Sequence, residues 1–543
     1  MNKQLVTLED DGYFNLGTYH RPMTTKSHDA QRWFNRGLIW AYGFNKQEAS
    51  NCFEKVITAD PDCAMGYWGL AYTRGPASRQ ALNLIRNASP VEQALIHAIV
   101  ARYPQSTPTD DYSVWNRAYA DAMKTVYKQF SDDLDIVVLY PYSSKPGPKA
   151  RTLDACAADS RALAQKSADK HPGLIHLHVH LMEMSRKPEV AVPSADLLRG
   201  LVPDSGHLNH MPSHIDVLIG DYQSAVAGNA AAVKADAKFV EKIGGMNMYV
   251  SGTFYRAHDY HSLIYAAMMC GQSRIALENC THLEEAIPEK LLMVESPPMA
   301  DWLKAFCAVR PHVLIRFGRW DDIINLTLPT NQSLYCVTTA TIYYAKGVAY
   351  AATGNLTECL KQQALLIEAL SRVPSSRMDY PNKCVDILKV AVAMLAGEIE
   401  YRRGNYEVAF EHLRQSIYLD DRLLYSEPWG WMQPARHAYA ALLLEQGRVE
   451  EAVAAYAEDL GLDESLPRGH QHPNNIWALR GYHECLTLLG RRAEAKLLEL
   501  LLKLATCLAD IPVQSSYFCS TNTQKVPVES GKSCNMSGSC HLK

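Results

Sequence analysis

The chain has 543 residues, a formal net charge of −4 at pH 7, 47% hydrophobic residues and 21% charged residues. This length exceeds one ordinary hydrophobic core, so it predicts three or four units or one extended repeat array in a folded globular protein. The near-neutral charge, without a Lys/Arg-rich run, gives no support to nucleic-acid binding. No apolar run reaches the roughly 20 residues of a membrane helix, so a membrane protein is not expected.

The first residues predict neither a signal peptide nor regular structure. Glu9, Asp10 and Asp11 interrupt any apolar stretch, so we expect the protein in the cytoplasm. Residues 1–25 show no hydrophobic period and are predicted to form an irregular lead-in. The 14 cysteines are mostly dispersed singly without a CxxC pair, which is typical of small buried side chains.

Residues 26–130 predict helix–turn–helix repeats. The segment WFNRGLIWAYGFNKQEASNCFEKVITADPDCAMGYWGLA places small and aromatic residues at the spacings of a 34-residue repeat, namely Trp33, Gly37, Ala41, Ala49, Phe53 and Pro61. We expect the small residues to let the helices approach closely and Phe53 to pack between units. Pro61 should end the second helix.

Residues 131–290 contain three blocks rich in histidine. The first block is HPGLIHLHVHLMEMS (171–185), in which His176, His180 and Glu183 fall on one face of a helix. His178 falls roughly opposite and is predicted to be a core residue. Just before these blocks, DIVVLYPYSS (135–144) is the one stretch left ambiguous between helix and strand.

The other two blocks repeat the close histidine spacing. GHLNHMPSHID (206–216) contains His207, His210 and His214, and Pro212 predicts a helix start that would leave His210 on the preceding loop. FYRAHDYHSLIYAAMMCG (254–271) contains His258 and His261, which share a helical face only loosely. The neighbouring carboxylates, Asp216 beside His214 and Asp259 beside His258, are interpreted as groups that orient the histidines.

Residues 291–505 predict further repeats of the same kind. Amphipathic helices are joined by glycine-centred turns at Gly354, Gly404, Gly447 and Gly490. The HQHPNN segment (470–475) is interpreted as a turn rather than a second histidine site. Residues 506–543 are rich in Ser, Gly, Asn and Cys and are predicted to be disordered.

Most of the chain, roughly 26–505, resembles tetratricopeptide-repeat (TPR) proteins, which implies an all-α solenoid. AYGFNKQEASNCFEKVITADPDCAMGYWGLA, HPGLIHLHVHLMEMS, HMPSHIDVLIGDYQSAVAGN and RFGRWDDI resemble more narrowly a bacterial and fungal group of TPR proteins that share a histidine-rich middle. This resemblance carries over the group's shared histidines, His176, His180, His207, His210, His214 and His258. It names no reaction.

The histidine blocks predict a site for a divalent transition metal, with His261 added to the six shared histidines as a ligand. An all-nitrogen set suits a copper pair, whereas nitrogen with Glu183 suits iron, manganese or zinc. The metal would activate dioxygen on a small organic substrate, the interpretation slightly favoured, or would activate water for hydrolysis or hydration. Glu183 is then a candidate base, and Tyr140, Tyr142 and Arg256 are candidate substrate contacts. The alternative is a non-catalytic TPR scaffold that binds a protein partner's peptide in its groove.

Overall fold

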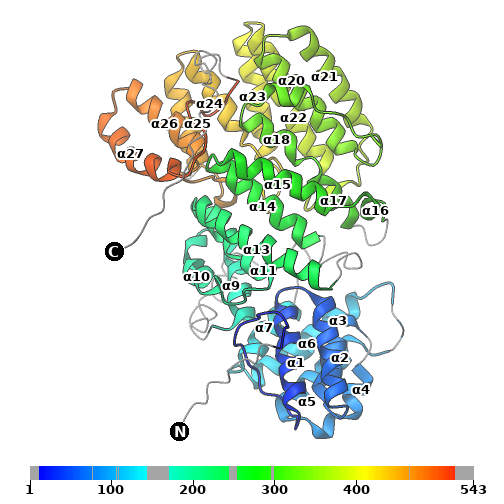
Figure 1. The fold of residues 1–543 in the computed structure, drawn as a ribbon. Coiled ribbons are helices and arrows are strands. Elements are labelled where there is room, and N and C mark those ends of the chain that lie inside the picture. Colours follow the sequence, from blue (N-terminus) through cyan, green and yellow to red (C-terminus); the bar gives the residue numbers. More distant parts are fainter. Residues whose placement is uncertain are drawn as a thin grey trace, which may run out of the picture.

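The chain folds into an elongated, all-α array of antiparallel helix pairs (Figure 1). The structure is a computed structural model that describes residues 11–75, 78–105, 107, 109–143, 170–243, 254–294, 299–463 and 465–519. Within these ranges the strands are limited to one antiparallel pair, β1 (Met378–Asp379) and β2 (Asn382–Lys383). The predicted TPR-like solenoid is therefore confirmed at the level of the fold.

The N-terminal helices form one end of the array. They are α1 (His28–Tyr42), α2 (Lys46–Ala59), α3 (Ala64–Arg74), α4 (Ser78–Asn83), α5 (Pro90–Arg102), α6 (Ser113–Gln129) and α7 (Leu134–Ser143), with the 3₁₀ turn η1 (Ile85–Asn87). Phe53 is fully buried, and its ring packs against Gly37 and Gly69. A Cβ at either glycine would lie within 3 Å of the ring, so the close approach depends on the missing side chains. The predicted packing of Phe53 between repeat units is confirmed.

The middle of the array carries the histidine blocks. Its helices are α9 (Pro172–Glu183), α10 (Val192–Leu198), α11 (Gly206–His210), α12 (Pro212–Ile219), α13 (Tyr222–Ile243), α14 (Tyr255–Met269), α15 (Ser273–Ala286), α16 (Glu289–Leu292), α17 (Met299–Phe306), α18 (Val309–Arg316) and α19 (Trp320–Ile324), with η3 (Pro188–Ala191). Helix α12 packs on α9, and α11 packs on both α13 and α14. These contacts bring the three histidine blocks together.

The C-terminal helices form four further pairs. They are α20 (Cys336–Ala352), α21 (Leu356–Ser371), α22 (Cys384–Arg402), α23 (Tyr406–Asp420), α24 (Ala435–Glu445), α25 (Val449–Leu460), α26 (Ile476–Leu488) and α27 (Arg492–Thr506), with η6 (Arg468–His470). The turn glycines predicted within these pairs, Gly354, Gly404, Gly447 and Gly490, have φ between 70° and 81°, a conformation that L side chains rarely adopt.

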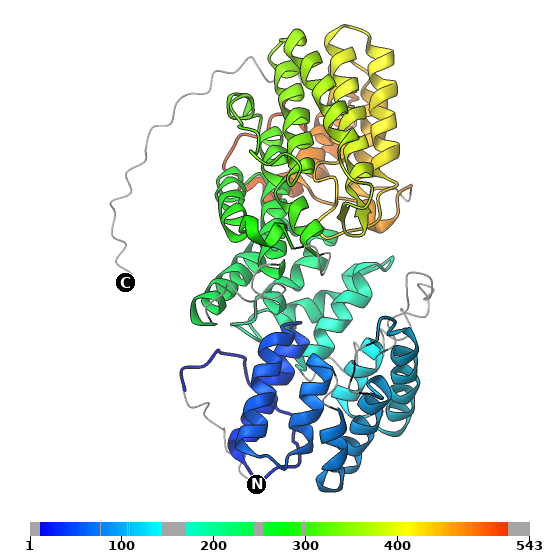
Figure 2. The same ribbon diagram turned by 90° about the vertical axis from the view of Figure 1, so that its right-hand side faces the viewer.

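The last helices turn back toward the middle of the molecule, as the view in Figure 2 shows. Trp477 of α26 is fully buried, and its indole N–H donates a 2.8 Å hydrogen bond to the carbonyl of Met268 at the end of α14. The C-terminal end of the array therefore braces the helix that carries the third histidine block.

Three hydrophobic cores fill the array. The first includes Leu174, Leu208 and Ile215 of the first two histidine blocks. The second includes Leu263 and most of α14, and the third fills the C-terminal helix pairs. The histidine blocks thus lie where the first core meets the second.

Several local predictions have a different outcome in the structure. The ambiguous stretch at 135–144 forms helix α7 as far as Ser143. Residues 11–25 contain no helix, in line with the predicted lead-in, and residues 1–10 lie outside the described part. Disorder from residue 506 was a wrong prediction for the segment up to 519, because Tyr517 and Cys519 are buried in the third core. Residues 520–543 lie outside the described residues.

The HQHPNN segment forms a turn that is tied to the C-terminal core. His472 lies 2.9 Å from Asp459, and the side chain of Asn475 caps helix α26 by accepting from the Ala478 N–H. None of the described helices is long and apolar enough to cross a membrane.

Candidate metal centre

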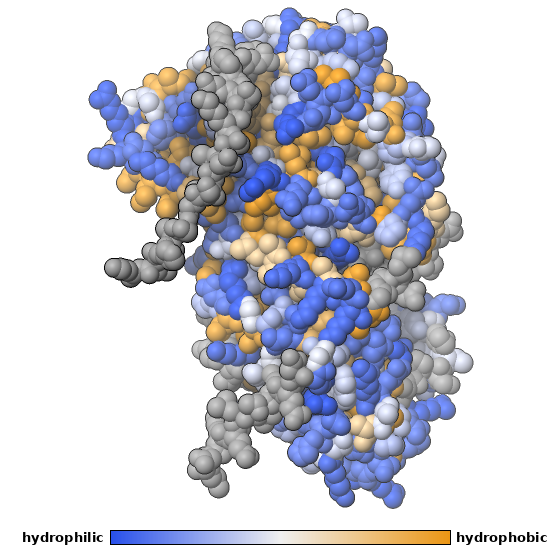
Figure 3. Space-filling view, in the orientation of Figure 1, coloured by the Kyte–Doolittle hydropathy of each residue, from blue (hydrophilic) through white to orange (hydrophobic). Residues whose placement is uncertain are grey.

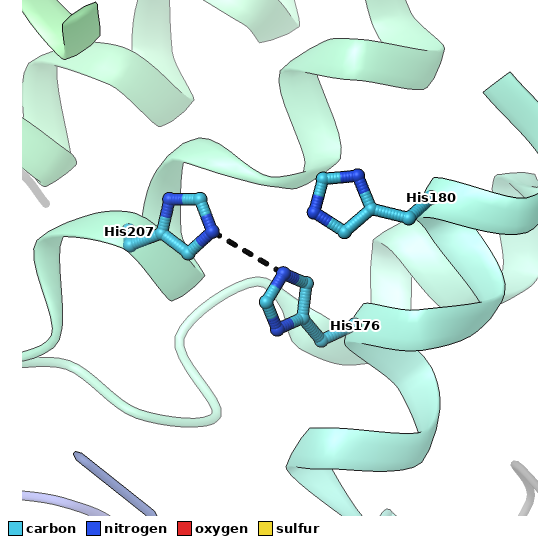
Figure 4. A group of neighbouring side chains, drawn as sticks. All are labelled: His176, His180 and His207. Atoms are coloured by element: carbon cyan, nitrogen blue, oxygen red, sulfur yellow. Dashed lines mark hydrogen bonds between the residues drawn. The ribbon is translucent and has the colours of Figure 1, made fainter. Parts of the chain in front are cut away.

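Six of the seven predicted histidine ligands lie together between α9, α11, α12 and α14. They form two groups, each with ligand nitrogens within 4.8 Å of one another. We name these the first triad (His176, His180 and His207) and the second triad (His210, His214 and His258). Figure 4 shows the first triad, in which the rings from α9 and α11 point toward one another.

The local sequence explains how α9 presents its pair of histidines. His171 accepts a hydrogen bond from the Leu174 N–H and caps the helix, and Pro172 occupies its first turn. His176 and His180 then lie one turn apart on one face. His178 points away from them and is fully buried, with its Nδ1 2.8 Å from Ser194, so the prediction that it is a core residue is confirmed.

The second pair differs from its prediction in one respect. Pro212 does begin helix α12, but His210 is the last residue of the short helix α11 and is not on a loop. Only Met211, itself in helical conformation, separates the two helices. Because the chain stays nearly helical through the proline, His210 and His214 remain on one side.

Oxygen acceptors hold the Nδ1 atoms of two histidines, one in each triad. The Nδ1–H of His176 donates to the backbone carbonyl of Tyr42 at 2.6 Å, and that of His210 donates to the Oδ1 of Asn229 at 2.6 Å. A carbonyl oxygen only accepts hydrogen bonds, so the proton of each ring lies on Nδ1. The lone pair of each Nε2 is left free.

The carboxylate of Glu183 accepts from the Nδ1–H of one more histidine in each triad. Glu183 faces the Nδ1 of His180 with one oxygen at 3.0 Å and the Nδ1 of His214 with the other at 2.5 Å. Glu183 therefore links the two triads and fixes which nitrogen of each ring is free. This is the usual arrangement behind a metal-bound imidazole.

Nε2 atoms approach one another closely within both triads. The Nε2 of His176 lies 3.2 Å from that of His207, and the Nε2 of His210 lies 2.7 Å from that of His214 and 3.1 Å from that of His258. In the pair His210 and His214 both ring protons lie on Nδ1, so two lone pairs face each other at 2.7 Å and repel unless a cation lies between them. Metal–nitrogen distances of about 2.0–2.1 Å place the ligand nitrogens of one ion roughly 3 Å apart, which matches these spacings.

Burial keeps four of the six rings neutral. Removal from water, followed by the charges of neighbouring histidines, lowers the pKa of His176, His207, His210 and His258 well below the usual value. Neutral imidazole is the form that binds a metal.

A second carboxyl group, from a distant part of the chain, completes the site. Glu427 lies 3.1 Å from the Nδ1 of His214. Burial, followed by the charge of Glu183, raises the pKa of Glu427 well above its usual range. Burial also opposes ionisation of Glu183, but His180 and His214 outweigh it and hold its pKa well below its usual range. The two carboxyl groups therefore share one negative charge.

Three of the predicted site residues lie apart from the triads. His261 has its Nε2 3.4 Å from the sulfur of Met432 and lines a separate cavity with His312. Tyr140 stacks on Tyr127 in the N-terminal core, with ring centroids 5.0 Å apart. Arg256 lies over the ring of Tyr260 at 5.7 Å. The side chain of the further candidate, Tyr142, lies outside the described residues.

The neighbouring aspartates do not orient the histidines expected from the sequence. Asp216 accepts from Arg199 at 2.6 Å and does not face His214. Asp259 lies 3.5 Å from the Nδ1 of His210 and does not orient His258. An adjacent residue on a helix projects about 100° away, so proximity in sequence did not imply contact. Tyr42 and Asn229, the acceptors that orient His176 and His210, had no local sequence signal, and neither did Glu427.

No protein family and no curated protein matches this chain. Among solved structures, yeast Tom70 is 12% identical with a TM-score of 0.33, covering 87% of this chain and 96% of that one. The TPR domain of P58(IPK) is 10% identical with a TM-score of 0.21, and the match covers 86% of this chain and 99% of that one. A chain in the structure of Naa15/Naa10 bound to HypK-THB is 12% identical with a TM-score of 0.21, and the match covers 89% of this chain and 74% of that one. These values carry no argument about function.

Proposed function

We propose that this chain is a TPR-like protein in which the two triads hold a pair of transition-metal ions, within the histidine-rich group that its sequence resembles. The observation that carries the proposal is the close approach of Nε2 atoms whose protons lie on the opposite nitrogen, down to 2.7 Å between His210 and His214. A cation between each set of nitrogens removes the repulsion of their lone pairs.

The donor set supports copper most directly. Glu183 is occupied with the Nδ1 atoms of His180 and His214, so each triad offers three imidazole nitrogens. Imidazole-only sets suit copper, and also zinc or iron, whereas manganese favours oxygen ligands. A redox-active pair would supply electrons to dioxygen for oxidation of a small organic substrate. Zinc in the same positions would instead activate water for hydrolysis.

The chain's own residues have distinct roles in this proposal. Glu183 and Glu427 hold one proton between them beside His214, which places a proton donor and acceptor at the edge of the second triad. Tyr42 and Asn229 fix the rings of His176 and His210. Arg256 and Tyr140 have no role here because their described contacts lie elsewhere.

The test is metal content. Purified wild-type protein, loaded with Cu(II) or Zn(II) and freed of excess, should retain two ions per chain, and His176→Ala and His214→Ala should each lower this number with helix content unchanged. His178→Ala is the matched control, since this buried histidine of the same helix should leave the metal content unaltered. Absence of stoichiometric iron, copper, zinc or manganese, with stability unchanged by chelation, would overturn the proposal.

A second candidate function is the peptide-binding scaffold. A groove of about 370 Å³ lies beside α26 and α27 and is lined by charged residues that include Arg480, Glu499 and Lys503. Helix α27 also exposes a row of leucines, namely Leu497, Leu500, Leu501 and Leu504, and Figure 3 shows an apolar surface in this region. Exposed apolar rows of this kind mark protein contacts.

The two functions are separable by experiment. If the scaffold carries the function, a partner recovered with the wild-type protein should be retained by His214→Ala and lost by Leu500→Asp. If the metal pair carries it, His214→Ala should abolish activity and Leu500→Asp should not.

A further inference from the structure

The two triads have different surroundings. The first is covered by Phe44, whose ring centroid lies 4.7 Å from that of His176 and 4.9 Å from that of His207. Tyr255 packs on His207 as well, at 4.8 Å. Phe44 has φ of 61°, a conformation that is strained for a bulky residue and is held only where the surrounding structure demands it. An aromatic lid therefore covers the ligand nitrogens of the first triad, and the Nε2 of His180 is buried although 27% of its side chain is exposed.

The second triad borders a small internal cavity instead. His210 and His214 form part of its wall, together with Val217, Tyr265, Tyr425, Glu427 and Trp429. Its volume is about 20 Å³, enough for a molecule of two or three atoms. A small organic molecule does not fit there without movement of the walls.

Two tyrosines that line the cavity have hydroxyl groups that no described residue satisfies. Tyr265 is only 1% exposed, and its hydroxyl makes no hydrogen bond within the described part of the chain. Tyr425 is only partly buried, but its hydroxyl oxygen is buried and has no hydrogen-bond partner there. Buried hydroxyls are normally hydrogen-bonded, so two of them on one cavity beside two histidines point to a ligand that accepts hydrogen bonds.

We infer that the second triad is the ligand-binding half of the metal pair, and that its cavity takes a small molecule with lone pairs, of the size of dioxygen or azide. This inference rests on the proposed metal pair. The hydroxyls of Tyr265 and Tyr425 donate to the ligand, while the first triad, closed by Phe44, takes no outside ligand. The two ions are therefore inequivalent.

The experiment uses Cu(II)-loaded full-length protein and azide as the probe, with the azide-to-copper absorption band as readout. The wild type should bind one azide per two coppers. Tyr265→Phe should weaken azide binding roughly tenfold or more, because it removes a hydrogen bond to a charged ligand. Val217→Leu, which adds bulk to the cavity wall, should abolish the band. Copper content should stay at two ions in both variants.

Tyr255→Phe is the matched control, because this tyrosine lies over the first triad and should leave azide affinity unchanged. Phe44→Ala should open the first triad and add a second azide. The inference would be overturned if the wild type bound two azides, or bound none although it held two coppers. It would also be overturned if the band responded to Tyr255→Phe and not to Tyr265→Phe. Failure of the wild type to hold copper would instead overturn the proposed metal pair.

Discussion

Glu183 bridges His180 and His214 through its two carboxylate oxygens, at 3.0 Å and 2.5 Å from their Nδ1 atoms. His180 belongs to the first triad and His214 to the second, so one side chain sets the tautomer in both halves of the site.

Glu183→Gln should lower the metal content from two ions to one. An amide offers one acceptor oxygen and one NH₂ group, and the NH₂ cannot accept from an Nδ1–H. Either His180 or His214 must then carry its proton on Nε2 and be lost as a ligand. Metal analysis with helix content as control checks this result, and retention of both ions would contradict it.

Glu427→Ala should weaken metal binding at the second triad while leaving the fold intact. The carboxyl group lies 3.1 Å from the Nδ1 of His214, and loss of a group behind a ligand typically lowers affinity by roughly 10- to 100-fold. Titration with a competing chelator measures the effect. The exposed Glu411→Ala is the control, and equal affinities for the two variants would refute the role of Glu427.

Metal release on acidification should begin well below pH 6.5. Protons and metal compete for the same nitrogen, and burial lowers the pKa of His176, His207, His210 and His258. Protonation of these rings therefore requires a lower pH than that of an exposed histidine. Metal content after dialysis at a series of pH values from 8 to 4 gives the midpoint, and a midpoint near 6.5 would show ordinary histidines.

Asp135→Asn should destabilise the support of α9. Asp135 is buried, pairs with Arg21 at 2.5 Å and lies 3.2 Å from His171, the cap of that helix. Burial opposes its charge, but His171 and Arg21 prevail and hold its pKa well below the usual range. Removing one partner of a buried ion pair costs about 3 to 5 kcal/mol.

The pH dependence of that contribution has a definite sign. The folded pKa lies below the value of about 3.9 in the unfolded chain, so the stabilisation is complete above that value and is lost as the pH falls through the folded pKa. The free energy of unfolding of the metal-free protein, measured with denaturant, should therefore fall less between pH 5 and pH 2 in Asp135→Asn than in the wild type. The exposed Asp62→Asn should behave like the wild type.

The sequence by itself determined the helical repeats and most of the histidines that the fold brings together. Phe53 between Gly37 and Gly69 follows from the 34-residue pattern, because each repeat buries its apolar face against its neighbour. Histidines at a spacing of four share a helical face wherever the helix lies, so His176 could be paired with His180 in advance. Pro212 predicted a loop position for His210, and only the structure showed that His210 stays on one side with His214.

Only the tertiary structure decided which groups surround those pairs. His258 joins the second triad whereas His261, three residues later, faces a separate cavity, because α14 turns by roughly 300° between them. Glu427 reaches His214 across 213 positions, and Phe44 closes the first triad from the N-terminal helices. Contacts of such large sequence separation depend on how the helix pairs stack, and helical periodicity carries no information about that stacking.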